Sequence, residues 1–512
     1  MADLRSFIKE LEEKDLLFRI TELINKDTEL MPLVRWQYKG LKDEQRKAFL
    51  FEKVTDNKGI KYNCSVAVSL LGTRKVYECA AGAGGVELRD RLVRALTNPV
   101  APLFVDSENP PVQEEVHIGA GLMEHGGLME FPVPVSTLGF DPAAFFTAAH
   151  WISQDPETGI RNVGTYRGMI KGPLKTGIMI SPLNQMGMHI RKCREMGIKY
   201  LQAALVIGSP VEVGMLSVIR IPYGVDELAI AGGITGKPVR LAKCLTIDLM
   251  APMDAEIVIE GRIPVDVTEL EGPFGEFSGY MSAREPQPVF EVTCISHRKD
   301  PICQVYISEM PPSESSIMKR FFIEAQLYKL LKNDLGITSL TDVAVYDTCG
   351  SDNYCVIQFK KKTPGEVWQA LRGVAAFTPG FGKFVVAVDH DIDLNDPDSV
   401  NWAMSYHTQP HRDIEILNRK VGILDPSCAP LTAPHSEQVF PKPYGNSIML
   451  IDATRKWDYP PISLPPKDTM ENAKKLWERM GLPPLTPKGI WYGYELGFWN
   501  DELRQLAKDA LE

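Results

Sequence analysis

The sequence lacks the patterns by which cysteine builds metal sites or disulfide frameworks. Its nine cysteines are scattered, with no Cys-x-x-Cys pair and none of the spacings that are typical of zinc sites. We therefore expect reduced thiols in a cytoplasmic protein, and not a secreted fold that depends on disulfides.

Long hydrophobic runs are also missing. No stretch approaches the roughly 18 consecutive apolar residues of a membrane-spanning helix. The N-terminus leads directly into an amphipathic helical pattern with Leu4, Ile8 and Leu11 apolar, and it has no apolar region of the kind found in signal peptides. The sequence predicts a protein without a membrane partner.

Positive charge is not in excess. The chain has 56 Lys and Arg residues against 66 Asp and Glu residues, which gives a formal net charge of −10. Nucleic-acid binding requires clustered cations that face phosphates. We interpret the short basic run Lys360–Lys362 as a solvated loop, so nucleic acid is not expected as a partner.

Several common catalytic and nucleotide-binding signatures are absent. The sequence has no G-x-S-x-G and no G-x-x-x-x-G-K-[ST], which disfavours esterases and P-loop proteins. In the glycine-rich run 81–87, Glu87 stands where a dinucleotide loop needs its third glycine. The acidic run that begins at Asp389 lacks the glycine of a calcium loop, and Pro410 breaks any helix that would pair His407 with His411. We interpret all three as structural.

The 512 residues suffice for roughly three domains at about 150 residues each. Residues 1–113 alternate helical and strand patterns, which predicts an α/β domain. Residues 114–314 contain short strands punctuated by Gly and Pro, as in a β sandwich or barrel. Residues 315–465 return to strand-helix alternation and predict a second α/β domain. Residues 466–512 form a helical arm that we expect to dock on another copy of the chain, giving a homo-oligomer.

Periodicity places the individual elements. Outside the central region we expect helices from Asp3 and at 87–96, 317–331, 364–375, 470–480 and 499–511, and strands at 48–54, 342–345, 354–360 and 384–388. In the central region we expect one clear helix, 189–196, and strands at 159–169, 178–180, 201–207, 244–249, 257–261, 288–296 and 302–307.

The most informative motif is a pair of glutamates, Glu271 and Glu276, that bracket the run Glu-Gly-Pro-Phe-Gly-Glu. The glycine-proline turn between them invites the two carboxylates to converge. Upstream, the polar segment Arg161–Arg167 interrupts apolar sequence and could supply an amide and a guanidinium to the same pocket. Together these groups suggest chemistry on an acid, although any one of them alone is more often a structural residue.

For Asn162 and Arg167 to share a pocket, the strand that carries them would have to be irregular. Asn162 and Arg167 have opposite parity on a regular strand, so their side chains would point to opposite faces. They can share a site only if the chain bulges or if the ligand passes between the faces. Gly164 could permit the bulge.

Four strings resemble the signature segments of the UbiD family of prenylated-flavin-dependent decarboxylases, in matching order and spacing. They are Asn162-Val-Gly-Thr-Tyr-Arg167, His189-Ile-Arg-Lys, Gly224-Val-Asp-Glu227 and Glu271-Gly-Pro-Phe-Gly-Glu276-Phe-Ser-Gly-Tyr280. The segments that begin at Lys383 and Val400 also resemble the C-terminal domain of the family. The resemblance implies an N-terminal α/β domain, a central split β-barrel of the flavin-reductase type, and a C-terminal α/β domain whose last helices help to form a dimer.

The resemblance also implies a cofactor, prenylated FMN, whose phosphate is bridged to the protein by Mn²⁺, or by Mg²⁺, together with K⁺. By position, the metal ligands would be Asn162, His189 and Glu227, a mixed oxygen and nitrogen set that suits Mn²⁺ better than a thiolate site would. Lys383 would add a contact to the phosphate. Gln185, in a loop that is longer than in ferulic-acid-type members, is a competing ligand.

Removal of CO₂ from an sp² carbon requires an electron sink, which the prenylated flavin would supply. By resemblance, Arg167 would bind the flavin and orient the substrate carboxylate. Glu271 would pair with Arg167. Glu276 would protonate the carbon after CO₂ has left, so its pKa must be raised.

The expected function is the reversible non-oxidative decarboxylation of an unsaturated carboxylic acid. The Tyr166-Arg167 pair and the long tail favour an aromatic ring acid, either free or as its acyl-CoA derivative. A flavin prenyltransferase would supply the cofactor, and a homodimer or homohexamer is expected. The alternatives are an FMN-dependent oxidoreductase on the same barrel, or a subunit of an aromatic carboxylase complex.

Overall fold

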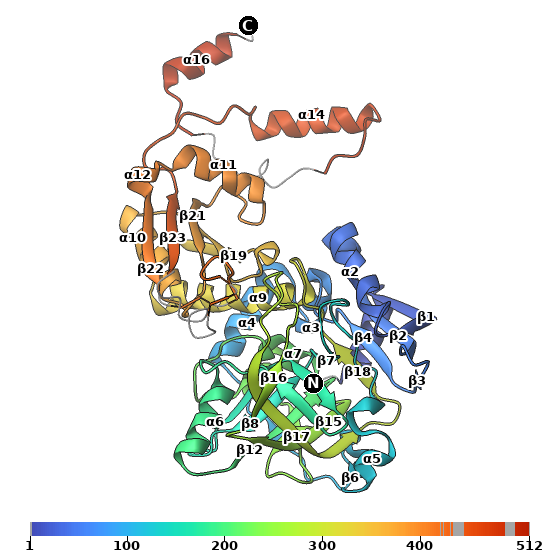
Figure 1. Cartoon of the computed structure of the whole chain (residues 1–512). Coiled ribbons are helices and arrows are strands. Elements are labelled where there is room, and N and C mark those ends of the chain that lie inside the picture. The colour runs from blue at the N-terminus through green and yellow to red at the C-terminus, as the bar shows by residue number, and fades with distance from the viewer. Residues whose placement is uncertain are drawn as a thin grey trace. The chain divides into compact units, whose positions relative to one another are not determined.

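The computed structural model describes residues 3–419, 421–422, 424–430, 432–433, 445–486 and 497–510. The chain divides into two compact units (Figure 1). The first comprises Met1–Gln326 with Asp347–Ser351, and the second comprises Leu327–Tyr346 with Asp352–Glu512. No helix among the described residues is both long enough and apolar enough to cross a membrane.

The smaller sheet of the first unit has the strand order β1-β2-β4-β18, with β3 beside β2. Its strands are β1 (Leu17–Asn25), β2 (Ala48–Thr55), β3 (Lys61–Tyr62), β4 (Ser65–Val68) and β18 (Ile302–Val305). The associated helices are α1 (Leu4–Glu13), α2 (Leu30–Gly40), α3 (Arg74–Ala81) and α4 (Gly85–Thr97). The predicted helix from Asp3 is confirmed, since the Asp3 side chain caps α1 by accepting from the Ser6 backbone N–H.

The glycine-rich run forms the connection between α3 and α4. Gly82 ends α3 in the left-handed conformation, with φ of 64°, and Gly84 is the N-cap of α4. A glycine ends a helix in this way because it has no Cβ to clash in that conformation.

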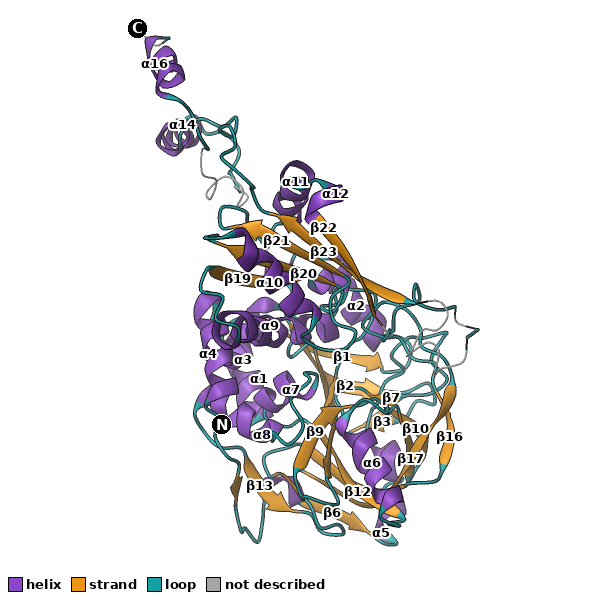
Figure 2. Ribbon diagram, turned by 90° about the vertical axis from the view of Figure 1, so that its left-hand side faces the viewer, coloured by secondary structure: helices purple, strands orange, loops and turns teal. Residues whose placement is uncertain are grey.

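The larger sheet of the first unit follows the order β7-β10-β11-β17-β15-β12-β8-β9, with β16 and β6 paired to β17 (Figure 2). Its strands are β6 (Glu115–Ile118), β7 (Phe145–Phe146), β8 (His150–Gln154), β9 (Arg161–Thr165), β10 (Gly168–Gly172), β11 (Lys175–Ile178), β12 (Tyr200–Ile207), β15 (Ile257–Pro264), β16 (Thr268–Glu271) and β17 (Glu285–His297). Within the described residues, no strand pairing joins the two ends of this path, β7 and β9.

Several expectations for this region are wrong. The strand expected at 159–169 is divided into β9 and β10, and the strand expected at 178–180 lies earlier in the chain as β11, which ends at Ile178. Residues 244–249 are not a strand but the connection between β13 (Arg240–Lys243) and β14 (Met250–Pro252), which pair antiparallel. The predicted helix is present as α6 (Gln185–Glu195), but α7 (Val211–Ser217) and α8 (Glu227–Thr235) accompany it. Every residue of α7 is buried, so the sequence shows no polar stripe by which a helix would be recognised.

The second unit contains a sheet of order β19-β20-β21-β23-β22. Its strands are β19 (Leu340–Val345), β20 (Tyr354–Phe359), β21 (Phe384–Asp389), β22 (Ile414–Arg419) and β23 (Asn446–Ala453). Its helices include α10 (Pro364–Ala375), α11 (Pro397–His407), α14 (Lys467–Arg479) and α16 (Asp501–Asp509), while α9 (Glu314–Tyr328) begins in the first unit. The predicted helix 364–375 is confirmed at both ends.

The predicted domain boundaries after residues 113, 314 and 465 stay predictions. The strand β18 belongs to the predicted central region but pairs with β4 of the N-terminal region. Residues 487–496 and 511–512 of the predicted arm lie outside the described residues. In the described part of the arm, α14 and α16 have no buried residue.

Candidate active site

Arg167 lies where the chain passes between two strands of the larger sheet. The strand β9 ends at Thr165 and β10 begins at Gly168. The pairing of β9 with β8 is regular as far as Gly164 and Thr165, so the bulge considered at Gly164 is absent. The break at Tyr166 and Arg167 removes the parity conflict instead, because a residue outside a strand does not have to follow the alternation of the pleat.

Gly164 has a different role. A Cβ atom at this position would lie 2.5 Å from the hydroxyl oxygen of Tyr166. The absence of a side chain at Gly164 therefore lets the Tyr166 ring fold back over β9. The indole of Trp151 holds the turn from the other side, since its Nε1 donates to the Tyr166 carbonyl at 2.6 Å.

The Arg167 guanidinium makes a bidentate ion pair with Glu271. Its Nε donates to Oε1 at 2.8 Å and its Nη2 donates to Oε2 at 2.7 Å. Glu271 is 1% exposed and Arg167 is 9% exposed. Parallel N–H donors that meet a carboxylate in this way fix the orientation of both groups, so Arg167 is held rigidly.

Glu276 contacts the same guanidinium, because Arg167 Nη1 donates to its Oε1. The two glutamates converge as the sequence predicted, through a tight loop after β16. Gly272 has a φ of 80°, and a Cβ atom there would lie 2.7 Å from the Ala283 carbonyl oxygen, so the loop requires glycine. The Glu276 backbone N–H donates to the Tyr280 carbonyl at 3.0 Å, which returns the chain toward the site.

Burial and neighbouring charges shift the pKa values of Glu276 and Arg167. Burial raises the pKa of Glu276 above its ordinary value, and the charge of Glu271 adds to this, while Arg167 and Lys319 oppose it. Burial alone would lower the pKa of Arg167, but the two carboxylates outweigh it and the pKa is raised. The guanidinium therefore keeps its charge at any physiological pH.

Two N–H groups of Arg167 are left for another acceptor. A guanidinium has five N–H donors, and the hydrogen bonds with Glu271 and Glu276 use three of them among the described residues. The Phe274 ring lies against the guanidinium, and the Cζ atom of Arg167 is 5.2 Å from the centroid of the ring. The group can thus bind one further carboxylate.

Sequence reasoning missed Asp141. Its Oδ2 accepts from the Thr137 backbone N–H at 2.6 Å, while its buried Oδ1 has no hydrogen-bond partner among the described residues. Burial raises the pKa of Asp141 to about 6, although Arg35 and Arg167 oppose the shift. Asp141 lies in irregular chain between η3 (Gly127–Glu130) and β7, so no periodic pattern marks it.

A second group of predicted residues lies on β9 and on two helices that contact β9. Asn162 is on β9, His189 is on α6, and Glu227 is the first residue of α8; each is at most 3% exposed. In Figure 2, α6 lies against the larger sheet, where it contacts β8, β9 and β12. The structure therefore gathers all three residues around one strand.

Hydrogen bonds connect this group. Ser153, which pairs with Asn162 across β8 and β9, bonds through its Oγ to His189 Nδ1 at 3.0 Å. The Glu227 carboxylate accepts from the Val163 backbone N–H at 2.9 Å through Oε2. These contacts orient the His189 ring and the Glu227 carboxylate toward the Asn162 side of β9.

Gln185 also reaches the group. Its Nε2 donates to Glu227 Oε1 at 3.4 Å and to the Ile221 carbonyl at 3.3 Å. Gln185 and His189 are four residues apart on α6 and so share a face of the helix. Gln185, the alternative metal ligand, thus lies beside the predicted ligands and contacts Glu227.

The donors fit a hard divalent cation. Burial lowers the pKa of His189 to about 4, so the ring is neutral at pH 7, and Ser153 engages Nδ1, which leaves Nε2 for a ligand. The buried Nδ2 of Asn162 has no hydrogen-bond partner among the described residues. Because amide oxygen and nitrogen have the same shape, the flipped amide would present its oxygen at that place. An amide oxygen, an imidazole and a carboxylate could together hold a metal ion.

Lys383 belongs to the second unit, directly before β21. Its Nζ donates to Asp425 Oδ2 at 2.8 Å and to Ser427 Oγ at 2.5 Å. The predicted contact between Lys383 and a phosphate stays a prediction.

Family models match most of the chain. The model described as the 3-octaprenyl-4-hydroxybenzoate carboxy-lyase Rift-related domain matches residues 104–311. The model described as the C-terminal domain of the same carboxy-lyase matches residues 316–453. A protein of Synechocystis sp. without an assigned function is 30% identical over 441 residues, with 81% of this chain and 84% of the relative covered.

Solved structures are similar over nearly the whole chain. The UbiD-class enzyme HmfF from Pelotomaculum thermopropionicum, in complex with FMN, has a TM-score of 0.79 and 30% identity, covering 92% of this chain and 100% of that one. An evolved dimeric form of HmfF in complex with prFMN has a TM-score of 0.77 and 29% identity, covering 93% and 100%. The vanillic acid decarboxylase of Sedimentibacter hydroxybenzoicus, in closed form, has a TM-score of 0.79 and 26% identity, covering 94% and 99%.

Proposed function

Because the chain belongs to the UbiD family of carboxy-lyases, we propose that it catalyses the reversible non-oxidative decarboxylation of an aromatic carboxylic acid with prenylated FMN as cofactor. The observation that carries this proposal is the buried Arg167, held by Glu271 and Glu276 with two N–H donors left over. The family matches do not favour the alternative of an FMN-dependent oxidoreductase. The structure is also similar to that of a decarboxylase of vanillic acid, an aromatic ring acid.

The cofactor occupies the central region, residues 114–314, whose larger sheet we propose forms a split β-barrel. Support comes from the elements that carry the buried polar residues, since Asn162, His189 and Glu227 lie on this sheet or on helices connected to it. The cofactor would be supplied by a flavin prenyltransferase. The assembly is a homodimer or homohexamer in the cytoplasm, with residues 466–512 at a subunit contact.

Asn162, His189 and Glu227 would hold Mn²⁺, or Mg²⁺, which together with K⁺ would neutralise the charge of the cofactor phosphate. The proposal rests on the donor set, because two oxygens and one neutral imidazole nitrogen suit a hard or borderline cation. A cation at this place would also compensate the buried Glu227 carboxylate, since Arg161 pairs with the neighbouring Asp226 at 2.7 Å. Lys383 would add a second contact to the phosphate.

When bound, the prenylated flavin supplies the electron sink that decarboxylation at an unsaturated carbon requires. The chain's own residues position the acid. Arg167 binds the substrate carboxylate through its two remaining N–H donors, and the bidentate pair with Glu271 keeps the guanidinium from turning. Phe274, packed on the guanidinium, excludes water from that side.

Glu276 then delivers the proton that replaces CO₂. In the free protein its carboxylate pairs with Arg167, which lowers its pKa against the raising effect of burial. A substrate carboxylate at Arg167 competes for the same guanidinium and brings a second negative charge close to Glu276. Both effects raise the pKa of Glu276. Substrate binding therefore favours the protonated form of Glu276, which the reaction needs.

Proton uptake on binding is a direct prediction of this arrangement. An unreactive aromatic carboxylate should bind with net proton uptake at a pH just above the pKa of Glu276 in the free protein, because that pKa rises on binding. Calorimetry in two buffers of different ionisation enthalpy measures the uptake. The Glu276→Gln variant should bind without it. Binding to the parent protein with no proton uptake, or with proton release, would contradict the proposed role.

The metal ligands predict a second result. Glu227→Gln should reduce the affinity for Mn²⁺ by about 100-fold or more, since even residues that only support a ligand are worth about 10–100-fold. Glu195→Gln is the matched control, because Glu195 is an exposed residue on α6, whose side chain is 67% exposed. Manganese content and the electron paramagnetic resonance of bound Mn²⁺ measure the effect. Equal manganese binding by both variants would remove Glu227 from the set.

The function itself is tested by turnover. Protein co-produced with a flavin prenyltransferase is incubated with a panel of aromatic acids, each as the free acid and as its CoA thioester. We expect release of CO₂ and formation of the decarboxylated product from at least one ring acid. Loading with prenylated flavin without turnover of any member, combined with reduction of free flavin by NAD(P)H, would favour the oxidoreductase.

A further inference from the structure

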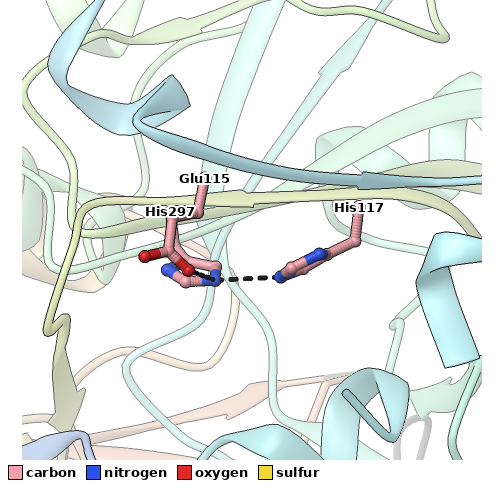
Figure 3. Close-up of side chains that lie close together, drawn as sticks. All are labelled: Glu115, His117 and His297. Carbon is pink, nitrogen blue, oxygen red and sulfur yellow. Dashed lines mark hydrogen bonds and ion pairs between the residues drawn. The ribbon is translucent and has the colours of Figure 1, made fainter. Parts of the chain in front are cut away.

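A cluster of histidine and glutamate side chains lies on the larger sheet and shares no residue with the site described above. Glu115 and His117 are on β6, and His297 is the last residue of β17. The two strands pair antiparallel, with Glu115 opposite His297 and His117 opposite Ile295. Because alternate residues of a strand share a face, the three side chains project from the same face of the sheet (Figure 3).

The two imidazole nitrogens are spaced as two corners of a tetrahedral metal site, and the Glu115 carboxylate lies near a third corner. His117 Nε2 and His297 Nε2 are 3.2 Å apart, and Glu115 Oε2 is 3.7 Å from His297 Nε2. One ligand atom from each residue lies within 4.8 Å of the others. For bonds of about 2.0–2.1 Å, the corners of a tetrahedron around zinc are roughly 3.3–3.4 Å apart, so one ion could reach all three residues with small adjustments.

Glu130 supplies a fourth donor from a different element. It ends the short 3₁₀ helix η3, and its carboxylate spans the two imidazoles, with Oε2 3.5 Å from His117 Nε2 and Oε1 3.6 Å from His297 Nε2. The Oε2 atom is buried and has no hydrogen-bond partner among the described residues. A buried carboxylate oxygen that lacks a donor is costly, and a cation between the rings would compensate it.

The orientation of His297 favours metal binding over a hydrogen-bond network. Its Nδ1 is 2.8 Å from the Arg298 carbonyl oxygen, and a carbonyl can only accept, so Nδ1 carries the proton. In the neutral ring, the lone pair of Nε2 then faces the cluster, where a metal ion would take the place of a proton. Ligating histidines are commonly fixed in this way, by donating their other ring N–H to a carbonyl or carboxylate.

Without an ion, the cluster is poorly satisfied. The two Nε2 atoms at 3.2 Å can share only one hydrogen atom between them, and the buried Oε2 of Glu130 has no donor among the described residues. A divalent ion instead accepts one lone pair from each imidazole and carries two charges to match two carboxylates. Histidine and carboxylate ligands in tetrahedral arrangement suit zinc.

We propose that Glu115, His117, Glu130 and His297 form a structural zinc site. Four protein ligands leave no open position, which is typical of structural and not of catalytic zinc. The ion would fasten η3, and the chain that connects it to β6, onto the sheet. It is separate from the proposed Mn²⁺ ligands, with which it has no residue in common.

The test is a zinc titration of untagged full-length protein that has been dialysed against a chelator, with a chromophoric competitor as indicator. The parent protein should bind one zinc ion per chain at this site. The His117→Gln and His297→Gln variants should lose that ion, and Glu130→Gln should weaken it by about 10-fold or more. Glu227→Gln should retain it, which distinguishes this site from the proposed cofactor-metal site.

Matched variants keep the result interpretable. Glu124→Gln removes an exposed carboxylate from α5 (Gly121–Glu124) in the same segment and should bind zinc as the parent does. Glu115→Gln changes a half-exposed side chain, so it should fold even if the histidine variants do not, and it should lower the zinc affinity. X-ray absorption of the zinc-loaded parent should show two imidazoles. No zinc binding by the parent, or binding that survives both His117→Gln and Glu115→Gln unchanged, would overturn the proposal.

Discussion

Replacing Glu276 by glutamine is expected to abolish turnover while leaving the cofactor bound. Glutamine has nearly the same size and can still accept from Arg167 Nη1, but it has no acidic proton to give to the substrate carbon. General acid catalysis contributes typically about 10²–10⁴-fold, so kcat should fall by that factor. Single-turnover assays of flavin-loaded protein would measure the loss at the step after CO₂ departs.

Glu269→Gln is the matched control for this experiment. Glu269 is on the same strand, β16, two residues before Glu271, and its partners are Lys171 and Lys175. It touches no member of the arginine-glutamate set in the described contacts, so turnover should stay near that of the parent. If Glu276→Gln retained full turnover, the proton would have to come from elsewhere and the role of Glu276 would be wrong.

The parent enzyme should also lose activity as the pH rises. Glu276 has a raised pKa and is needed in its protonated form, so the active fraction is complete below that pKa and declines above it. The Glu276→Gln variant should not show this alkaline limb.

Replacing Arg167 by lysine has the second large effect. Lysine keeps the positive charge that compensates the two buried glutamates, but a single ammonium cannot form the bidentate pair with Glu271 and still offer two donors to a substrate. We expect kcat/KM to fall by about 10²–10³-fold, the loss typical of removing one positioned donor from a reacting charge. Steady-state kinetics on flavin-loaded protein would show the effect.

Measurements of the free energy of unfolding distinguish the contribution of the Arg167 charge from that of its hydrogen-bond geometry. Arg167→Leu would remove the cation that pairs with both Glu271 and Glu276, at a cost of about 3–5 kcal/mol in the free energy of unfolding. Arg167→Lys should lower the free energy of unfolding much less, because the positive charge is kept. Arg240→Lys is the control, because Arg240 forms a comparable two-pronged pair with Asp254 outside the site. If the Arg167→Lys protein were as active as the Arg240→Lys protein, Arg167 would not bind the substrate carboxylate as proposed.

The local features of the site could be predicted because short sequence spans determine them. The run from Glu271 to Glu276 contains both the carboxylates and the turn that brings them together, and the structure confirms their convergence on Arg167. The starts of α1 and α10 were equally accessible, since the capping residue Asp3 marks the first and Pro364 marks the second.

Other features depend on tertiary context. The helices α7 and α8 were missed because burial on all sides removes the polar stripe that reveals a helix. The connection 244–249 resembles a strand in composition but is closed as a turn, with the Cys244 backbone N–H donating to the Leu249 carbonyl at 3.0 Å. Composition alone does not distinguish these arrangements.

The cluster of Glu115, His117 and His297 was also beyond sequence reasoning. The alternation of Glu115 and His117 gives a weak signal, because two polar residues on one face of a strand usually face water. Their partner His297 is brought beside them only by the pairing of β6 with β17, between residues 180 apart in the chain. Such pairings follow from the whole topology and not from any local pattern.

The central claim is that the buried polar residues around β9 hold a prenylated flavin through a metal-bridged phosphate. The most direct test is a native mass spectrum of the protein co-produced with a flavin prenyltransferase, beside the Glu227→Gln variant prepared in the same way. The parent should carry the mass of prenylated FMN with a divalent ion, and the variant should carry less of both. A parent protein that retains no flavin, or a Glu227→Gln variant that retains both flavin and metal as well as the parent does, would contradict it.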